Sequence, residues 1–347
     1  MFSVPNPDVA FNEEVIHFPM LHHPAPTKVL LIGGGIGGTL EQVLKHPVGE
    51  VHYAELDPLI IEAAREYSPQ SFLRALDDPR VSTKYVDGRL FVKNTRETYD
   101  AVIVTLPSPS TLQLNRLYTR EFFIEVANIL KPGGVFSTTI PSSETYLSRE
   151  MIDHNRCIYE TLKEVFNNVL IIPSDYNILL ASSGDELASQ DIAVLCRRFE
   201  SRELETKLVT TDYIKYRLNP VRTERLLAPI LTSDKTTVNR DLHPIGCYYN
   251  MALWNSMFYP DTAGFFRGVS QLRLWWFVIP AGMLLLAALG VAVRRKAARS
   301  GLMPIAIAII TTGFAGMTFS IILLLSLQTL EGYLYQKLAV IIAAFML

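Results

Sequence analysis

Cysteine and net charge are what this sequence has least of. Its 347 residues include three cysteines, Cys157, Cys196 and Cys247, which form neither a CxxC pair nor a disulfide framework. We therefore expect a reducing compartment and three small, buried cysteine side chains. Lys and Arg number 32 against 34 Asp and Glu, for a net charge of −2. No basic field therefore indicates nucleic acid as a partner.

Metal-ligand spacing and internal repeats are also missing. The candidate histidines His17, His22, His23 and His46 do not show the spacing of zinc ligands on a helix face. We expect surface or capping roles for them and no metal cofactor. No repeated segment or low-complexity tract indicates a solenoid or a disordered chain.

Long apolar runs are absent from residues 1–270 and then dominate the sequence. Residues 274–293 read LWWFVIPAGMLLLAALGVAV without a charge, which matches the ~20 residues that cross a hydrocarbon core. A second run covers residues 302–327. A third, residues 338–347, is too short to cross and counts as an incomplete span. We expect an integral membrane protein, with the lipid bilayer as a partner.

The charges between the two long runs bear on the topology. The connecting loop carries Arg294, Arg295, Lys296 and Arg299, and the positive-inside rule would place it in the cytoplasm. The domain before the first run would then lie outside. The cytosolic cofactor inferred below favours the opposite, and we give it more weight. We expect the domain to be cytoplasmic.

A glycine turn near the N-terminus predicts a nucleotide site. The segment TKVLLIGGGIGGTLEQVLKH begins with a short apolar strand, residues 29–32, and Gly33, Gly35 and Gly38 follow as G-x-G-x-x-G. Glycines let the backbone approach a ligand, and the helix that follows adds a favourable dipole. The same pattern is also typical of any tight strand–helix turn.

Acidic residues follow the next two predicted strands. The strand in VHYAELDP ends at Glu55, 22 positions after Gly33 (55 − 33), near the ~20-residue spacing of a ribose-binding carboxylate. Asp57 before Pro58 is instead typical of a helix cap, for a helix over residues 58–68. The third strand, within VSTKYVDGRLFV, is followed by Asp87 and Gly88.

Strands and helices alternate over the rest of the first half. DAVIV and VFSTTI predict the fourth and fifth strands, and a helix between them should stop at the K-P-G-G of residues 131–134. YNILLASS, residues 176–183, predicts a later strand. This alternation favours a doubly wound α/β fold, a parallel sheet with helices on both faces.

The motifs together point to a family. G-x-G-x-x-G suits NAD as well, but D-G after the third strand and L-K-P-G-G before the fifth resemble the S-adenosylmethionine-dependent transferase fold. The run HHPAPTKVLLIGGGIGG, with AELDP, YVDGRLFV and LYTREFF, resembles the spermidine/spermine synthases, the polyamine aminopropyltransferases, over residues 11–185. The segments NRDLHPIGCYYNMALW and QTLEGYLYQKLAVIIAAFM resemble the membrane-fused branch of that family.

The resemblance implies a ligand and a reaction. The donor would be decarboxylated S-adenosylmethionine or S-adenosylmethionine itself. The glycine turn and Glu55 would hold its ribose side, and Asp87 with Gly88 its adenine side. In the family, an amine attacks the carbon beside the sulfonium and methylthioadenosine leaves.

The acids that would hold the amine and remove its proton are replaced. Ile36 stands in the family's G-G-G-D-G-G turn, and Thr105 and Ser108 stand where D-S-S-D-P carries two acids. Each missing carboxylate removes ~1 to 4 kcal/mol of attraction for a cation, and a neutral Thr is a poor base. Thr105 and Ser108 thus mark catalytic positions that have lost their acids.

Three other carboxylates are candidates to replace them. Glu13 and Glu14 lie in the segment FNEEVIH, which resembles the substrate side of the family. Glu144 follows the fifth strand, and either enters the site or opens a helix.

We divide the chain into a synthase-like domain over residues 1–185, a helical extension over 186–271 and transmembrane helices over 272–347. In the extension, residues 185–204 predict an amphipathic helix, and LHPIGCYYNMALWNSMFY suits a helix at the membrane surface. The first interpretation is a membrane-attached, aminopropyltransferase-like enzyme with a small acceptor. The alternatives are an inactive nucleotide sensor that controls a membrane transport module, and a methyltransferase. The oligomeric state stays open, a homo-oligomer included.

Overall fold

The computed structural model describes two parts of the chain. They are residues 8–258, apart from 69, 185–186, 188–190 and 235–236, and residues 302–331; between them only 276, 279, 282–283 and 286 are described. The chain divides into two compact units, Met1–Leu253 and Trp254–Leu347. The candidate site lies in the first unit.

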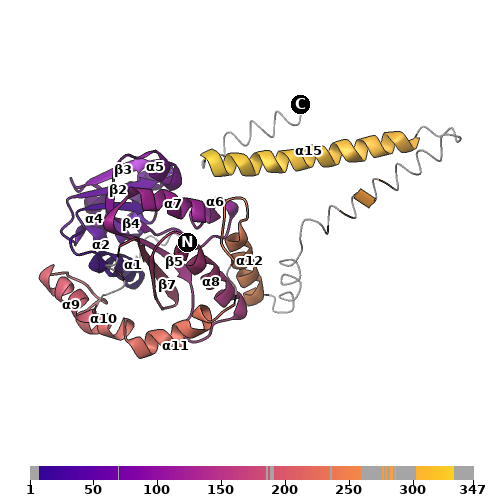
Figure 1. Ribbon diagram of the computed structural model, residues 1–347. Helices are drawn as coiled ribbons and strands as arrows, with labels where there is room; N and C mark the ends of the chain where they lie inside the picture. Colours follow the sequence, from indigo (N-terminus) through magenta and orange to yellow (C-terminus); the bar gives the residue numbers. More distant parts are fainter. Residues whose placement is uncertain are drawn as a thin grey trace. The chain divides into compact units, whose positions relative to one another are not determined.

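The first unit is built on one seven-stranded sheet (Figure 1). The order across it is β3-β2-β1-β4-β5-β7-β6. The five strands β1 to β5 run parallel, whereas β7 is antiparallel to both β5 and β6. The expected parallel sheet is therefore correct for five strands and wrong at this edge. The strands are β1 Lys28–Ile32, β2 Glu50–Glu55, β3 Val81–Tyr85, β4 Tyr99–Val104, β5 Leu130–Pro141, β6 Asn168–Ile172 and β7 Tyr176–Ser182.

Helices cover both faces of the sheet, as the alternating sequence predicts. The first face carries α1 Val9–His22, α2 Thr39–Leu44, α3 Pro58–Tyr67 and α4 Gln70–Leu76. The second face carries α5 Gly88–Asn94, α7 Arg120–Ile129 and α8 Arg149–Lys163. The remaining described helices are η1 Gly35–Gly37, α6 Leu112–Asn115, α9 Ile192–Ser201, α10 Thr211–Arg217, α11 Pro220–Leu231, α12 Ile245–Phe258 and α15 Leu302–Glu331.

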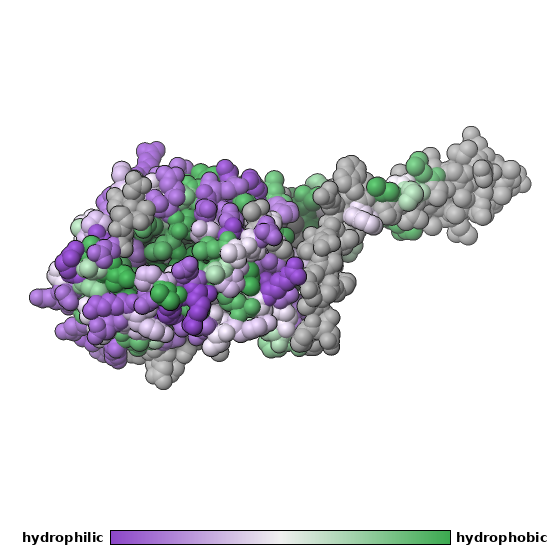
Figure 2. Space-filling model, turned by 60° about the horizontal axis from the view of Figure 1, so that its bottom comes forward, coloured by the Kyte–Doolittle hydropathy of each residue, from purple (hydrophilic) through white to green (hydrophobic). Residues whose placement is uncertain are grey.

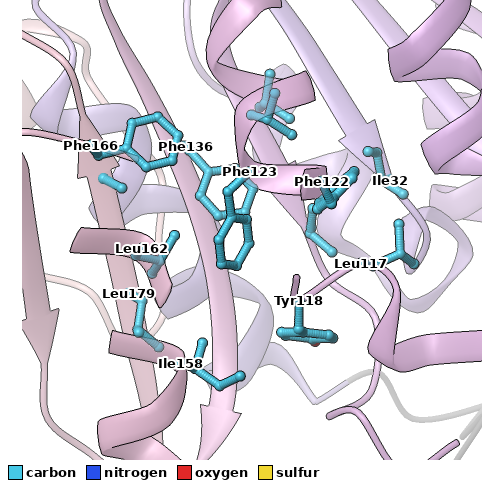
Figure 3. Close-up of a cluster of buried hydrophobic side chains, with 14 of the residues drawn as sticks. Ile32, Leu117, Tyr118, Phe122, Phe123, Phe136, Ile158, Leu162, Phe166 and Leu179 are labelled. Carbon is cyan, nitrogen blue, oxygen red and sulfur yellow. The ribbon is translucent and has the colours of Figure 1, made fainter. Parts of the chain in front are cut away.

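The central strands bury both of their faces. Along β1, Leu30 and Ile32 pack on one side, and Val29 and Leu31 pack on the other. Successive strand residues point to opposite faces, so a strand covered by helices on both sides is apolar throughout. Aromatic rings fill the second face: Figure 3 shows Phe122 and Phe123 of α7 beside Phe136 of β5 and Phe166.

Two predicted boundaries agree with the structure to within a few residues. A helix was expected to stop at the K-P-G-G segment, and α7 ends at Ile129, directly before β5 begins at Leu130 and pairs with Tyr99 of β4. The third strand was expected to end before Asp87, and β3 ends at Tyr85. Asp87 accepts a hydrogen bond from the Leu90 amide and so begins α5 directly after the strand.

The four N-terminal histidines are buried, so the predicted surface roles are wrong. His17 and His46 lie 2.9 Å apart between ring nitrogens, and His17 also contacts Gln42 at 3.2 Å. Burial lowers the pKa of His17 to about 4 and that of His46 well below its usual value. Both rings are therefore neutral structural groups that join α1 to α2.

Arginines of α9 complete the C-terminus of α1. Arg198 Nη1 donates to the carbonyls of Leu21 and His22, at 2.7 and 3.0 Å, and Arg202 Nη1 donates to that of Met20 at 2.8 Å. Cations at this end satisfy carbonyls that have no partner within the helix and complement its dipole. The extension is thus packed on the synthase-like domain.

The structure gives no support to the predicted membrane spans. Across the residues that it describes, it contains no helix with the length and apolar character needed to cross a bilayer. The predicted run 302–327 falls within α15. Most of the run 274–293 lies outside the described residues.

Candidate nucleotide site

Four strand ends meet at one edge of the sheet. The glycine turn follows β1, Glu55 ends β2, Asp87 follows β3 and Thr105 follows β4. Because these strands are parallel, their carboxyl ends lie together. The chain turns to β2 on one side of β1 and to β4 on the other, and such a switch point is where open α/β sheets bind ligands.

The backbone conformation and the space around the glycine turn explain why glycines are needed there. Gly33, Gly34 and Gly38 have φ values of 72°, 68° and 108°, which side chains rarely adopt. Gly35 is constrained by space, because a Cβ there would lie 2.5 Å from the ring of Tyr53. Asn12 of α1 closes the turn from outside and donates to the Gly37 carbonyl at 2.6 Å.

Glu55 is buried and held in one orientation. Its carboxylate accepts from the Tyr53 hydroxyl at 2.6 Å and from the Leu56 amide at 2.9 Å. Burial, followed by the charge of Glu55, raises the pKa of Tyr53, so the phenol remains a donor. A carboxylate has about four lone-pair positions, which leaves Glu55 able to accept further hydrogen bonds at the edge of the sheet.

Asp87, for which the resemblance implies an adenine contact, makes two contacts within the protein. One carboxylate oxygen caps α5, and the other forms a buried ion pair with Arg116. Gly88 has a packing role, because a Cβ there would lie 2.3 Å from Ile32 Cγ2. No local pattern in the sequence indicates a role for Arg116, because it lies beyond the loop after β4 and contacts Asp87 only in the folded chain.

Thr105 is a structural hydrogen-bond donor. Its Oγ1 donates to the Gly33 carbonyl at 2.8 Å, and its amide donates to the Ile32 carbonyl at 3.1 Å. A Cβ on Gly34 would lie 2.3 Å from the same Oγ1. The threonine therefore locks the end of β4 to the glycine turn, and its hydroxyl proton is already engaged.

The other two positions where the sequence predicts lost acids, Ile36 and Ser108, also have partners within the fold. Ile36 is 5% exposed and packs in the apolar cluster of the first face. Ser108 donates to Asn250 Oδ1 of α12 at 3.1 Å. The three positions predicted to have lost acids thus carry one apolar side chain and two hydroxyls, and each has partners within the fold.

The candidate replacement acids are occupied elsewhere. Glu13 is fully buried and accepts from the amides of Lys207, Leu208 and Val209 at 2.7–3.0 Å. Burial would raise the pKa of Glu13, but the three backbone hydrogen bonds together lower it. Glu14 accepts a hydrogen bond from the Tyr213 hydroxyl.

Glu144 neither opens a helix nor lies free. It forms ion pairs with Arg217 and Arg222 at 3.1 and 2.6 Å, whereas α8 begins at Arg149 with Ser148 as its cap. The helix-start role predicted for Glu144 is therefore wrong. Within the described residues, no group of three or more His, Cys, Asp or Glu side chains is placed to hold a metal ion.

The segment Asn239–Asp241 ties the extension to this part of the domain, and its role was not predicted from the sequence. The side-chain Nδ2 of Asn239 donates to Asn115 Oδ1 at 3.0 Å and to the Tyr118 carbonyl at 2.9 Å. Asp241 binds Arg89 through both carboxylate oxygens, each at 2.7 Å. These contacts hold the chain that leads into α12 against the loop after β4.

A mostly parallel seven-stranded sheet with a glycine turn at its switch point defines an α/β fold of the S-adenosylmethionine-dependent transferase type. The family model of the spermine/spermidine synthase domain matches residues 8–182. The chain belongs to the spermine/spermidine synthase family.

Curated relatives and solved structures agree with this assignment. A polyamine aminopropyltransferase of Korarchaeum cryptofilum is 39% identical over 156 residues, 45% of this chain and 47% of the relative. Polyamine aminopropyltransferase 1 of Bacillus cereus is 30% identical over 59% of this chain and 73% of its own length. The chain spans about half the length of the first of these relatives. A spermidine synthase solved with the transition state analogue AdoDATO superposes with a TM-score of 0.55 at 28% identity, covering 65% of this chain and 78% of that one.

Proposed function

We propose that this chain binds an S-adenosyl nucleotide at the carboxyl edge of β1 to β4. The observation that carries the proposal is the Glu55 carboxylate, buried beside the glycine turn and oriented by Tyr53 and the Leu56 amide. The two ribose hydroxyls are donors that such a carboxylate accepts. Family membership and the AdoDATO complex of a relative support an adenosyl ligand of this kind.

The same geometry favours a member of the family that does not transfer aminopropyl groups to diamines. A diamine needs negative charge to hold it and a base to remove a proton from the attacking ammonium. The Thr105 hydroxyl donates a hydrogen bond to the Gly33 carbonyl, and the Glu13 carboxylate accepts hydrogen bonds from three backbone amides. Neither is available as a base.

Two activities remain compatible with these residues. One is transfer to an acceptor other than a diamine. The other is nucleotide sensing without turnover, which is favoured by the engaged hydroxyl of Thr105 and by the pairing of Asp87 with Arg116. We also infer from the charge-free runs at residues 274–293 and 302–327 that the chain is attached to a membrane with its domain in the cytoplasm.

Calorimetric titration of the full-length protein in detergent tests the proposal. We expect heat of binding with S-adenosylmethionine, its decarboxylated form or methylthioadenosine. Glu55→Ala should weaken binding about 10- to 150-fold, because hydrogen bonds to a charged group contribute about 1.5–3 kcal/mol.

Glu62→Ala is the matched control, since Glu62 is an exposed acid on α3, and it should bind like the wild type. A folded sample that gives no heat with any of the three nucleotides contradicts the proposal.

A further inference from the structure

We infer that Asn250 of helix α12 completes a second ligand site beside the nucleotide, and that this site takes a neutral hydroxyl-bearing group in place of an ammonium. The inference rests on the proposed function, because the site adjoins the glycine turn. It assigns a specificity role to the C-terminal extension, which lies outside the matched synthase domain at residues 8–182.

The side chain of Asn250 is buried and only half satisfied. The residue is fully buried, and its Oδ1 accepts from the Ser108 hydroxyl at 3.1 Å. Its Nδ2 is also buried and has no hydrogen-bond partner among the described residues. Exchanging the amide oxygen and nitrogen would leave the oxygen unpaired instead. One polar atom therefore remains beside Ser108 in either orientation, and such an atom costs about 1–3 kcal/mol when it stays unpaired.

Ser108 places this atom next to the nucleotide site. It lies in the loop that begins at Thr105, and Thr105 is bonded to Gly33 of the glycine turn. Tyr118 holds the same loop by donating to the carbonyls of Leu106 and Pro107, each at 3.0 Å. A group bound at Asn250 therefore lies beside the loop that is bonded to the glycine turn, at the carboxyl edge of the sheet.

The position of α12 is fixed by contacts that leave little freedom. The Gly246 amide donates to Asn239 Oδ1 at 3.0 Å, while the Asn239 Nδ2 reaches Asn115. A Cβ on Gly246 would lie 2.8 Å from Asn239 Nδ2 and 2.9 Å from Asn115 Oδ1. Glycine is thus required for this close approach, which brings the first turn of α12 against α6.

A partly buried ion pair holds the same segment between Asn239 and Gly246. Asp241 binds Arg89 through two hydrogen bonds and accepts from the Thr119 hydroxyl at 2.8 Å. Arg89 also binds both carboxylate oxygens of Glu125, at 2.8 and 3.0 Å. The segment that leads into α12 therefore contacts Arg89 of α5, before β4, and Asn115 and Thr119, which follow the loop after β4.

The charge of the site decides the class of ligand. The groups that the structure brings to it are the Ser108 hydroxyl and the Asn250 amide, with the Thr105 hydroxyl and the apolar Ile36 nearby. None carries a charge, so a dication would lose its hydration without gaining a counter-charge. A hydroxyl can both donate and accept, so it pairs with the free atom of the Asn250 amide in either orientation.

Two probes of equal length test this inference, 1,4-butanediol and putrescine. Ligand-observed NMR on the full-length protein at pH 8, with saturating methylthioadenosine, gives their relative affinities. We expect the wild type to prefer the diol at least tenfold. Asn250→Asp and Ser108→Asp should each reverse the preference at least tenfold, because each places a carboxylate in the site. Ser108→Asp keeps the test valid if the buried Asn250→Asp does not fold.

Met251→Asp is the control, since Met251 is 45% exposed on the same helix, and it should behave like the wild type. Four results would overturn the inference: a wild type that prefers putrescine, probes that bind no variant, aspartates that leave the preference unchanged, or a Met251→Asp that reverses it. A separate titration with methylthioadenosine reports on the proposed function alone. A sample without nucleotide binding that still discriminates between the probes keeps this inference and refutes that proposal.

Discussion

Single residues decide what this site can do, and Thr105 shows how. The family resemblance implies a carboxylate at this position, whereas the threonine hydroxyl of this chain donates to the Gly33 carbonyl at 2.8 Å. The Thr105 side chain therefore stabilises the glycine turn. An aspartate in its place would put a negative charge next to the Gly33 carbonyl oxygen.

We therefore expect Thr105→Asp to lower the free energy of unfolding by about 1–3 kcal/mol, because a carbonyl acceptor loses its donor. It should not release methylthioadenosine when given decarboxylated S-adenosylmethionine and putrescine. Urea unfolding and product chromatography measure the two effects. Thr105→Ser keeps the donor and should resemble the wild type. A Thr105→Asp protein that is stable and makes spermidine would contradict this role.

A second residue-scale prediction concerns His154 of α8. The side chain is fully buried, neither ring nitrogen has a hydrogen-bond partner among the described residues, and burial lowers its pKa to about 4. In the unfolded chain His154 binds a proton near pH 6.5, whereas in the folded protein it binds one only near pH 4. Its contribution to stability is therefore complete above pH 6.5 and is lost as the pH falls from 6.5 to 4.

His154→Leu should remove much of this dependence, on the order of 3 kcal/mol between pH 7 and pH 4. Urea midpoints across that range measure the effect. His243→Leu is the control, because His243 is exposed, and its slope should match that of the wild type. Equal slopes for the wild type and His154→Leu would show that other groups, such as His17 and His22, account for the loss of stability.

At the scale of elements, the docking of α12 depends on the space around one glycine. Gly246→Ala should lower the free energy of unfolding by about 1–3 kcal/mol, because its Cβ would meet the amides of Asn239 and Asn115 inside 3 Å. Hydrogen exchange should also accelerate over residues 245–253. Gly49→Ala is the matched control, since a Cβ there has ordinary contact at 3.5 Å. Unchanged exchange in Gly246→Ala would mean that α12 is held by other contacts.

Elements with a local signal were predicted well. The apolar runs identified β1, β4 and β7, and Asp57 before Pro58 identified the start of α3, where the Asp57 side chain accepts from the Leu59 amide at 2.9 Å. The helix at the end of the extension is likewise present as α12. The antiparallel edge could not be predicted, because strand direction depends on connections that the apolar pattern does not encode.

At the scale of the whole molecule, the membrane remains the main prediction. The full-length protein should enter the detergent phase in a Triton X-114 partition, because the two charge-free runs, residues 274–293 and 302–327, match the ~20 residues that a span needs. Leu285→Arg combined with Phe314→Arg should shift it toward the aqueous phase, since a central arginine costs about 2.5–3.5 kcal/mol in each run. Wild-type protein found wholly in the aqueous phase would refute membrane attachment.

The sequence by itself determined the features that neighbouring residues encode. Apolar strands, the glycine turn and the position of Glu55 after β2 follow from spacing and backbone preference, and they sufficed to indicate the family. The sequence also predicts that Ile36, Thr105 and Ser108 stand where the family resemblance implies acids. These features need no knowledge of which distant segments meet.

Only the tertiary structure decided what those side chains do. Asp241 binds Arg89 across 152 positions, and Glu13 accepts from the Leu208 amide across 195. The ion pair between Arg116 and Asp87 and the hydrogen bond between Ser108 and Asn250 also join residues that are far apart in the sequence. A buried charge or amide takes whichever partner the packed chain brings within about 3 Å, and the packing of the whole sheet and its helices sets that partner.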